Sequence, residues 1–355
     1  MKNNKNNKLF GVKEIARRAN VSIATVDRVI HNRSGVSPKT KDKIKDIIKK
    51  LDYKPNLLAR RLASKKVFQL ATLTPKVPGE TAYWEVLLKG IDQGEDEIKQ
   101  YGIRVVKYFF DQSDKTSFVQ QAELILKSKV DGVLVTPIFI EESIKFTQSC
   151  QKLNIPCVYI NSDIPNQDSL CYIGPNLYHS GYLAAHLISY LIGEKDRMLI
   201  VNISKEIESH HHILRKEEGF RAYFEDNAKP NAITKIDIRQ TDYDSVKKRV
   251  ADSLKKNKDI RVIFVTNSRV STVAHYLEMA GRKDILLIGY DFLENNIGYL
   301  KEGTIDFLIC QKPHEQAYRG IMTLYQHLIF GVEVDKVYFM PIDIITRENY
   351  LFYKN

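Results

Sequence analysis

From Val67 to about residue 312 the sequence repeats one pattern, in which a short apolar segment is followed by a polar or amphipathic stretch. The apolar segments are VFQLATLTP, IRVVKYFF, GVLVTPIF, CVYINSD and LCYIGPN, and then MLIVNIS, ITKIDIR, VIFVTN, ILLIGYD and FLICQK. Strands that alternate with helices predict parallel sheets covered by helices. Ten strands are too many for one comfortable doubly wound sheet, so we expect two lobes.

Polar side chains stand at the carboxyl ends of several of these strands. They are Asp111, Asn161, Asn267, Asp291 and Gln311. Each of them alone is more often a loop cap than a ligand contact. Open parallel sheets, however, bind ligands beyond the carboxyl ends of their strands. The recurrence of polar residues at equivalent ends therefore favours a binding site there.

The first 66 residues have a different composition. They contain 19 Lys/Arg and 5 Asp/Glu, a balance of +14, whereas the remaining 289 residues have a balance of −3. A basic module on a near-neutral body is typical of a nucleic-acid binder. Charge alone would also fit an arm that lies on a membrane surface, so the residue pattern has to decide.

That pattern predicts three short helices. Val12, Ile15, Ala16 and Ala19 form one apolar helix face, a second helix spans Ile23 to His31 with Val26 and Ile30 inward, and a third spans Thr40 to Asp52. Between the first two, Asn20 tolerates a left-handed turn and Ser22 is a good N-cap. Two short helices joined by such a turn and braced by a third make a helix-turn-helix unit.

The second helix of such a unit enters the major groove with its N-terminal residues against the base edges. Arg28 can contact guanine in a bidentate manner, and Ile23 and Ala24 can touch a thymine methyl group. The residues expected at DNA phosphates or facing the bases are Ser22, Thr25, Asp27 and His31. The alternative is a three-helix bundle with no nucleic-acid role, which the local positive charge disfavours.

The segment GVKEIARRANVSIATVDRVIHNRSGVSPKTKDKIKDIIKKLDYKPNLLARRLASKK resembles the headpiece of the lac-repressor family of bacterial regulators. Two positions depart from that family's pattern. Asn20 replaces a turn glycine, and Asp27 stands on the DNA-facing side where the family has serine. An acid there repels phosphate unless it accepts a hydrogen bond from cytosine or pairs with Arg17 or Arg28.

Residues 55–66 are basic with interspersed leucines, which on composition alone would also suit a solvated linker. The resemblance implies a hinge helix that forms on DNA, where two copies meet over the minor groove. The residues that the resemblance places on DNA are Asn56, Ala59 and Leu62, with Leu62 wedged between base pairs. Apolar wedges flanked by basic residues bend DNA from the minor groove.

From Val67 onward the chain resembles the periplasmic-binding-protein-like effector domain of the same family, on VDGVLVTP, IPCVYINSD, YIGPN, EEGFRAYF and ILLIGYD. The resemblance implies a sugar-like ligand between the lobes. It places Tyr83 and Trp84 where rings stack on a sugar, and Lys216, with Arg215 beside it, where the family has a cationic contact. The polar contacts that it implies are the strand-end residues Asn161, Asn267, Asp291 and Gln311.

The resemblance also implies the fold and the boundaries. We expect an all-α helix-turn-helix headpiece at 1–54, a hinge at 55–66 and a two-lobed α/β domain at 67–355 with two doubly wound parallel sheets. Lobe 1 should contain about 67–174 and 312–338, and lobe 2 about 175–311 and 339–355. The expected protein is a cytoplasmic, homodimeric or larger repressor of carbohydrate genes that binds a pseudo-palindromic operator and has no cofactor.

Two other functions would also suit parts of this sequence. A solute-binding protein of a transport system would need a signal peptide, and the start MKNNKNNK has no apolar core for one. An enzyme would need a catalytic motif, and none is found. The run His210–His212 could suggest a metal, but consecutive histidines cannot all face one ion, so we expect no metal site there. One of the three could instead contact the ligand at the mouth of the cleft. Cys150, Cys157, Cys171 and Cys310 show no pairing pattern, which predicts free thiols.

Overall fold

The computed structural model describes residues 11–30, 32–51, 53, 67–77, 82–164 and 166–354. The chain divides into two compact units, Met1–Ser64 and Lys65–Asn355. Each unit has its own hydrophobic core, which is helical in the first and built on sheets in the second. The predicted combination of a small all-α unit and a larger α/β unit is confirmed.

The described part of the first unit contains three helices: α1 (Val12–Ala19), α2 (Ile23–Ile30) and α3 (Pro38–Lys50). They pack around a core of Ile15, Ala16, Ala19, Val26, Val29 and Ile44. Asn20 has φ 59° and ψ 50°, the left-handed turn that the sequence predicted. The Ser22 Oγ accepts a hydrogen bond from the Thr25 amide at 3.1 Å, as expected of an N-cap.

Two details of this unit differ from the sequence prediction. In α2 the structure buries Val29 and leaves Ile30 half-buried, since both follow Val26 at helical spacing and only one can point fully inward. Helix α3 begins two residues before Thr40, because Ser37 caps it and Pro38 occupies its first turn.

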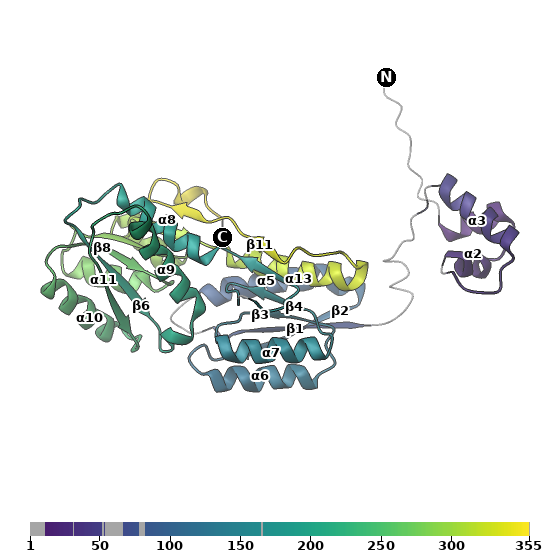
Figure 1. Ribbon diagram of the computed structural model, residues 1–355, viewed down its shortest axis with the longest axis horizontal. Coiled ribbons are helices and arrows are strands. Elements are labelled where there is room, and N and C mark those ends of the chain that lie inside the picture. The colour runs from purple at the N-terminus through teal and green to yellow at the C-terminus, as the bar shows by residue number, and fades with distance from the viewer. Residues whose placement is uncertain are drawn as a thin grey trace, which may run out of the picture. The chain divides into compact units, whose positions relative to one another are not determined.

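The second unit begins with a lobe of parallel strands. Its strands are β1 (Phe68–Pro75), β2 (Ile103–Phe110), β3 (Gly132–Val135), β4 (Cys157–Ile160), β5 (Cys171–Gly174) and, much later in the chain, β11 (Val337–Phe339). Its helices are α5 (Tyr83–Ile98), α6 (Lys115–Lys127), α7 (Ile140–Lys152) and α13 (Pro313–Phe330), with the 3₁₀ helix η1 (Lys99–Tyr101). Helices α5 and α13 pack together over one sheet face, and α6 and α7 cover the other (Figure 1).

The other lobe repeats this plan. Its strands are β6 (Arg197–Ile203), β7 (Ile233–Ile238), β8 (Ile260–Val265), β9 (Leu286–Tyr290), β10 (Phe307–Cys310) and β12 (Asp343–Ile345). Its helices are α8 (Leu177–Ser189), α9 (His211–Asp226), α10 (Tyr243–Lys256), α11 (Val270–Met279) and α12 (Glu294–Glu302), with the 3₁₀ helices η2 (Ile207–Ser209) and η3 (Tyr350–Phe352). Along β6, Leu199 and Val201 face the core under α10 and α11, whereas Met198 and Ile200 face α8 and α9.

The two sheets have the same strand order. The first is β11-β5-β4-β3-β1-β2 and the second β12-β10-β9-β8-β6-β7. All pairs are parallel except the antiparallel pair of β10 with β12. In each sheet the order reverses beside the lobe's first strand, β1 or β6, the place where doubly wound sheets bind ligands.

Within the described residues the chain passes between the lobes three times. It leaves the first sheet after β5, returns after β10 to form α13, and leaves again between β11 and β12. Lobe 1 is therefore built from two segments far apart in the sequence. The two three-residue strands β11 and β12 were not among the ten predicted strands.

Helices α8 and α9 touch backbone to backbone. A Cβ on Gly181 would lie 1.9 Å from the Lys216 carbonyl oxygen, and one on Gly219 would lie 1.9 Å from the Tyr178 carbonyl oxygen. Glycine at both positions permits this approach. The contact fixes α9, which carries Lys216, against the first helix of lobe 2.

Gly181→Ala should therefore destabilise the protein by about 3 kcal/mol or more, since overpacking a rigid backbone contact costs roughly 1–3 kcal/mol and occasionally more. Gly298 is the control, because it lies exposed inside α12 with nothing within 4 Å of its Cβ position. Gly298→Ala should gain about 0.5–1 kcal/mol through helix propensity. Urea unfolding of both variants measures the difference, and equal midpoints would show that α8 and α9 can separate freely.

Candidate functional site

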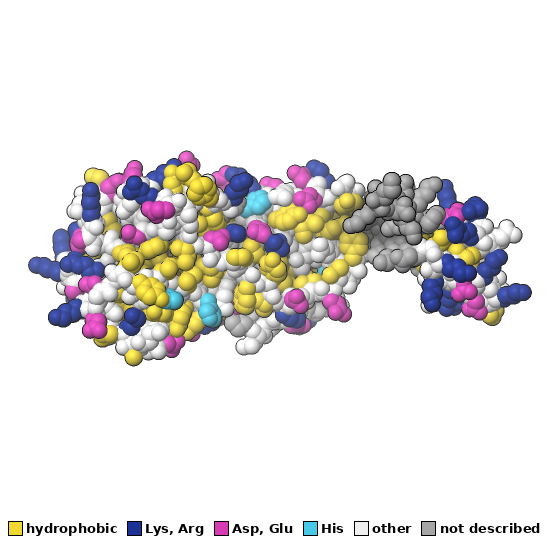
Figure 2. Space-filling view, turned by 90° about the horizontal axis from the view of Figure 1, so that it is seen from above, with side chains coloured by type: hydrophobic (Ala, Val, Ile, Leu, Met, Phe, Trp, Pro, Cys, Tyr) yellow, Lys and Arg dark blue, Asp and Glu magenta, His cyan; other side chains and the backbone are white. Residues whose placement is uncertain are grey.

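Helix α2 and the residue that caps it carry exposed side chains. Ser22, Ile23, Ala24 and Arg28 are exposed, and Ile23 is 50% exposed although it is a large apolar residue. Thr25 is half-buried beside its cap. Lys and Arg side chains cover much of the visible face of this small unit, at the right of Figure 2. The helix end that the sequence predicted to face bases is thus available on a basic surface.

Asp27 is half-buried and pairs with Arg33, whose Nη1 lies 3.3 Å from its Oδ2. From the sequence, a hydrogen bond from cytosine or a pairing with Arg17 or Arg28 had been the alternatives for this carboxylate. Arg17 donates to Glu14 one turn earlier on α1, and Arg33 reaches Asp27 from the loop after α2. His31, Asn56, Ala59 and Leu62 lie outside the described residues.

A cavity lies between the two lobes of the second unit, at the carboxyl ends of both sheets. It offers about 70 Å³ of space for the centres of water molecules, which holds about five waters at the roughly 10–15 Å³ that each needs. The residues that line it are Tyr83, Trp84, Gln112, Ser113, Ile138 and Asn161 from lobe 1, and Ile203, Ser204, Lys205, His210, His212, Lys216, Thr241, Asn267, Ser268, Arg269, Asp291 and Gln311 from lobe 2.

A chain of four hydrogen bonds runs through the floor of this cavity. The Tyr83 hydroxyl donates to Asn161 Oδ1 at 2.7 Å, and the backbone N–H of Asn161 donates to Gln316 Oε1 at 2.8 Å. Gln316 Nε2 donates to the Gln311 carbonyl at 2.6 Å, and Gln311 Nε2 donates to Asp291 Oδ1 at 2.8 Å. All five residues are buried, so the chain links the two lobes without solvent.

Asn161 and Asp291 occupy equivalent positions in the two lobes. Each is the first residue after the fourth strand of its sheet, β4 or β9, and each has a left-handed backbone, with φ 68° and 74°. Asn and Asp adopt this conformation more readily than other residues that have a Cβ. The turn directs both polar side chains to the cavity.

The lobe 1 wall is aromatic. Tyr83 and Trp84 stand at the start of α5 with their rings edge to face, 4.9 Å between centroids. Trp84 Nε1 donates to Gln112 Oε1 at 2.8 Å, which fixes the indole. A flat ring held beside amide groups suits the mixed apolar and polar faces of a small ligand.

Lys216 and Asp291 are buried charges on the lobe 2 wall. The Lys216 ammonium lies 3.6 Å from the centre of the Tyr290 ring. Burial lowers the pKa of Lys216 to about 8, against the opposing attraction of Asp291. Burial raises the pKa of Asp291 to about 6, although Lys216 and Gln311 oppose the rise.

Two predicted site residues do not line the cavity. Asp111 is exposed, and its carboxylate accepts from the Ser113 amide in its own turn, so Gln112 and Ser113 face the cavity instead. Arg215 lies one residue off the face of α9 that points inward, pairs with Glu218 and lies over the Tyr178 ring. Tyr83, Trp84, Asn161, Lys216, Asn267, Asp291 and Gln311 do line it.

Asn267 shapes the cavity through its own loop. Its Nδ2 donates to the Ile203 carbonyl at 2.7 Å, and its Oδ1 accepts from the Arg269 amide at 3.2 Å. Both groups of its amide are thus engaged with backbone. The cavity is also lined by Arg269 and Lys205, which were not among the predicted site residues. They follow strands β8 and β6, so the search for polar residues at strand ends would have found them if it had continued one or two residues further.

The three histidines lie where the lobes meet. His210 and His212 line the cavity, and His210 pairs with Phe139 of lobe 1 in an isolated antiparallel bridge. His211 Nδ1 lies 3.5 Å from Asp163 Oδ1, also in lobe 1. Burial lowers the pKa of His210 to about 4 and that of His212 well below its ordinary value. Among the described residues no group of three or more His, Cys, Asp or Glu side chains is arranged to hold a metal ion.

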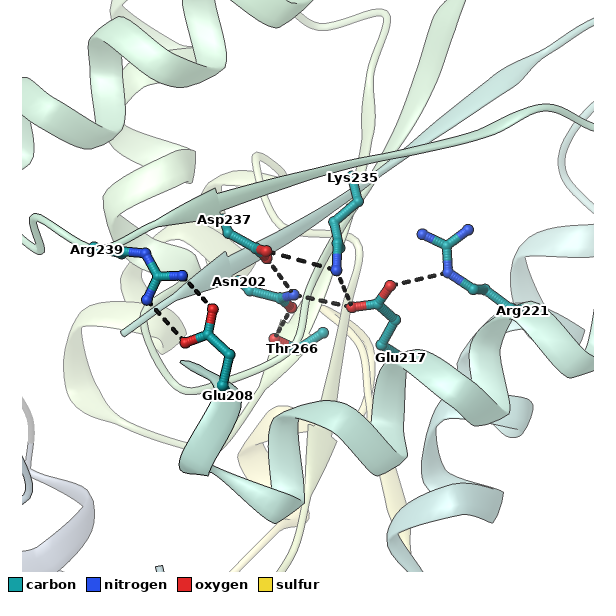
Figure 3. A network of polar contacts seen from close by, with 8 residues as sticks. All are labelled: Asn202, Glu208, Glu217, Arg221, Lys235, Asp237, Arg239 and Thr266. Carbon is teal, nitrogen blue, oxygen red and sulfur yellow. Dashed lines mark hydrogen bonds and ion pairs between the residues drawn. The ribbon is translucent and has the colours of Figure 1, made fainter. Parts of the chain in front are cut away.

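A buried polar cluster lies behind the lobe 2 wall (Figure 3). Asn202 Nδ2 donates to Glu217 Oε2 at 3.0 Å and to Asp237 Oδ1 at 2.8 Å, and its Oδ1 accepts from Thr266 Oγ1 at 2.7 Å. Asn202 is fully buried, so each of these bonds matters to the lobe. Glu217 and Thr266 each stand next in the chain to a residue of the cavity wall, which this cluster supports from behind.

Comparison with known proteins agrees with this arrangement. The lacI family of bacterial regulatory proteins matches residues 11–56, and the periplasmic binding protein domain matches residues 71–331. The catabolite control protein A of Staphylococcus xylosus is 27% identical over 337 residues, which is 86% of this chain and 97% of that protein. The crystal structure of a LacI transcriptional regulator from Bacteroides fragilis has a TM-score of 0.76 and 31% identity over 81% of this chain and 100% of that one.

The glucose-galactose binding protein GanP of Geobacillus stearothermophilus shares the fold of the second unit, with a TM-score of 0.71 at 21% identity over 80% of this chain and 99% of that one. A helix-turn-helix unit on a two-lobed ligand-binding domain defines a class of DNA-binding transcription regulators. The chain belongs to the lacI family of these bacterial regulatory proteins. No helix within the described ranges combines the length and the apolar character that a membrane-spanning segment needs.

The buried histidines predict a stability that depends on pH. In the folded protein the pKa of His210 is lowered to about 4, from the ordinary value of about 6.5. The free energy of unfolding is therefore highest above pH 6.5 and falls by about 3 kcal/mol in all as the pH drops toward 4, because the unfolded chain binds the proton more readily. His210→Gln should remove this loss. Asp291, whose raised pKa makes the folded state more stable as the pH falls, is present in both proteins, so its effect cancels in the comparison. Urea unfolding from pH 7.5 to 4 measures the difference, and parallel curves would contradict the assignment.

Proposed function

We propose that this regulator is a cytoplasmic homodimer that binds a pseudo-palindromic operator through α2 and changes its DNA affinity when a sugar-like effector fills the cavity between the lobes. The observation that carries the proposal is the cavity itself, whose walls come from both lobes and whose floor is one buried hydrogen-bond chain. A ligand that contacts both walls favours one arrangement of the lobes over others. The protein catalyses no reaction in this proposal.

The exposed side chains of α2 support the proposed DNA contacts. Arg28 is exposed for a bidentate contact with guanine, and Ile23 for a thymine methyl group. One unit offers only a few such side chains, too few for specificity in a genome. Two-fold symmetry of protein and operator doubles that number.

The chemistry of the cavity supports a polyhydroxylated effector. Trp84 offers a ring face, and Asn161, Asp291 and Gln311 offer amide and carboxylate groups that hydroxyl groups can bind. The small volume fits a single small ring rather than a chain of sugars.

The segment 55–66 is the proposed link between the two units. In this proposal it is a hinge whose two copies become helical over the operator, with Asn56 and Ala59 on DNA and Leu62 as the minor-groove wedge. Isolated helices of this length are marginal in water, so the dimer and the DNA must stabilise them. The arrangement of the lobes then sets how closely the two segments approach.

Replacing Arg28 tests the DNA contacts. Arg28→Ala should weaken binding to the operator by about 1–3 kcal/mol and relax the sequence preference at one base pair of each half-site. Lys49→Ala is the control, because Lys49 is an exposed cation at the end of α3 and its loss removes the same charge. Gel shifts on operator and randomised half-site DNA measure both effects. An equal loss of affinity in the two variants, independent of the DNA sequence, would show that α2 does not contact the bases.

Replacing Asp291 tests the cavity and its coupling to DNA. Asp291→Ala should weaken effector binding by about 1.5–3 kcal/mol, since it removes a charged acceptor, and Trp84→Ala should also weaken it. Asp111→Ala is the control, because the structure keeps that carboxylate outside the cavity. Thermal shift with a panel of sugars measures binding. An effector so found should alter operator affinity in the wild type and much less in Asp291→Ala.

A further inference from the structure

Lys216 is a buried cation that faces the cavity without an acidic contact. It is 2% exposed, lines the cavity, and lies over the Tyr290 ring. Within the described residues its ammonium group forms no hydrogen bond to a side chain and no ion pair within 4.0 Å, not even with Asp291. A buried charge without a hydrogen-bonded partner is unfavourable by several kcal/mol. The fold keeps this side chain in place, which calls for a partner that arrives with the ligand.

The charges around the cavity are unequal. Among the described residues that line it, three are cations, Lys205, Lys216 and Arg269, and one is an acid, Asp291. All four come from lobe 2, whereas the lobe 1 wall is aromatic or neutral. The excess positive charge is therefore on one side, and low-dielectric walls strengthen its attraction for an anion.

We propose that the effector carries one anionic group, a carboxylate or a phosphate, which binds on the lobe 2 wall at Lys216 while its hydroxylated ring lies against Trp84 on lobe 1. This inference rests on the proposed function and specifies the effector of the same cavity. Lys216 supplies up to three hydrogen bonds to the anionic oxygens. Lys205 adds positive charge on the same wall.

Asp291 restricts the position of the anion. Its carboxylate is already held by Gln311 Nε2 at 2.8 Å, so its remaining oxygen is a hydroxyl acceptor. An anion placed directly against it would meet repulsion. The anionic group must therefore approach Lys216 from the side away from Asp291, and a hydroxyl group of the ring takes the place beside Asp291.

The volume limits the size of this ligand. Space for about five waters suits one ring with one acidic substituent. Carboxylate and phosphate share the chemistry that Lys216 recognises, so the binding experiment has to separate them.

The test uses the full-length protein in a phosphate-free buffer at matched ionic strength. Thermal shift and calorimetric titration compare neutral D-glucose and D-galactose with D-glucuronate, D-galacturonate and glucose 6-phosphate, and use acetate and inorganic phosphate as controls for the bare anions. At least one acid should raise Tm while its neutral parent at the same concentration does not. A response to the uronates alone identifies a carboxylate effector, and a response to the phosphate ester alone identifies a phosphorylated one.

Variants then locate the anion. Lys216→Met should weaken binding of that acid at least tenfold, and Lys216→Arg, which keeps the charge, should retain most of it. Lys247→Met is the matched control, because Lys247 also lies over a tyrosine ring, that of Tyr243, but outside the cavity. It should bind as the wild type does.

The failures are distinguishable. Neutral sugars that bind as tightly as their acids, or an acid that binds Lys216→Met as tightly as the wild type, would overturn this inference and leave the proposed function standing. A wild-type protein that binds DNA but none of the compounds would count against both the inference and the sugar-like effector. The comparison of acid with neutral parent needs no variant, so it holds even if Lys216→Met does not fold.

Discussion

The buried hydrogen-bond chain from Tyr83 to Asp291 is the constraint on which the ligand-binding unit depends. Its middle member, Gln316, belongs to α13, the helix that follows the return of the chain from the second sheet to the first. In a low-dielectric interior each of these groups must keep its partner or lose about 1–3 kcal/mol. The lobes can therefore change their arrangement only in ways that preserve this chain or exchange its members for ligand atoms.

The regular elements and the general position of the site could be predicted from the sequence, because both follow from local patterns. All ten predicted strands form, and Asn20 and Ser22 adopt the expected turn and cap. Strands β11 and β12 were missed because three residues give no alternation to detect, and their place is set by distant partners.

The individual side chains of the cavity were harder to predict. Asp111 was selected one residue away from Gln112, and Arg215 was selected together with Lys216 although only Lys216 faces the cavity. A sequence shows where a strand or helix ends, but not which residue of the turn faces inward. The contact of His210 with the other lobe was also hidden, because its bridge partner Phe139 lies 71 positions earlier and belongs to lobe 1. Long-range contacts of this kind leave no local signal.

The division of lobe 1 between two distant segments has a consequence for how the protein is made. The helix α13 packs on α5, and β11 completes the first sheet, yet both are synthesised after the whole of β6 to β10. On the ribosome the three-helix unit has its full core once α3 has emerged, and can fold early. Neither lobe of the ligand domain has that possibility, because lobe 1 waits for α13 and lobe 2 for β12. The DNA-binding unit can therefore be complete before the ligand-binding unit that controls it in the proposed mechanism.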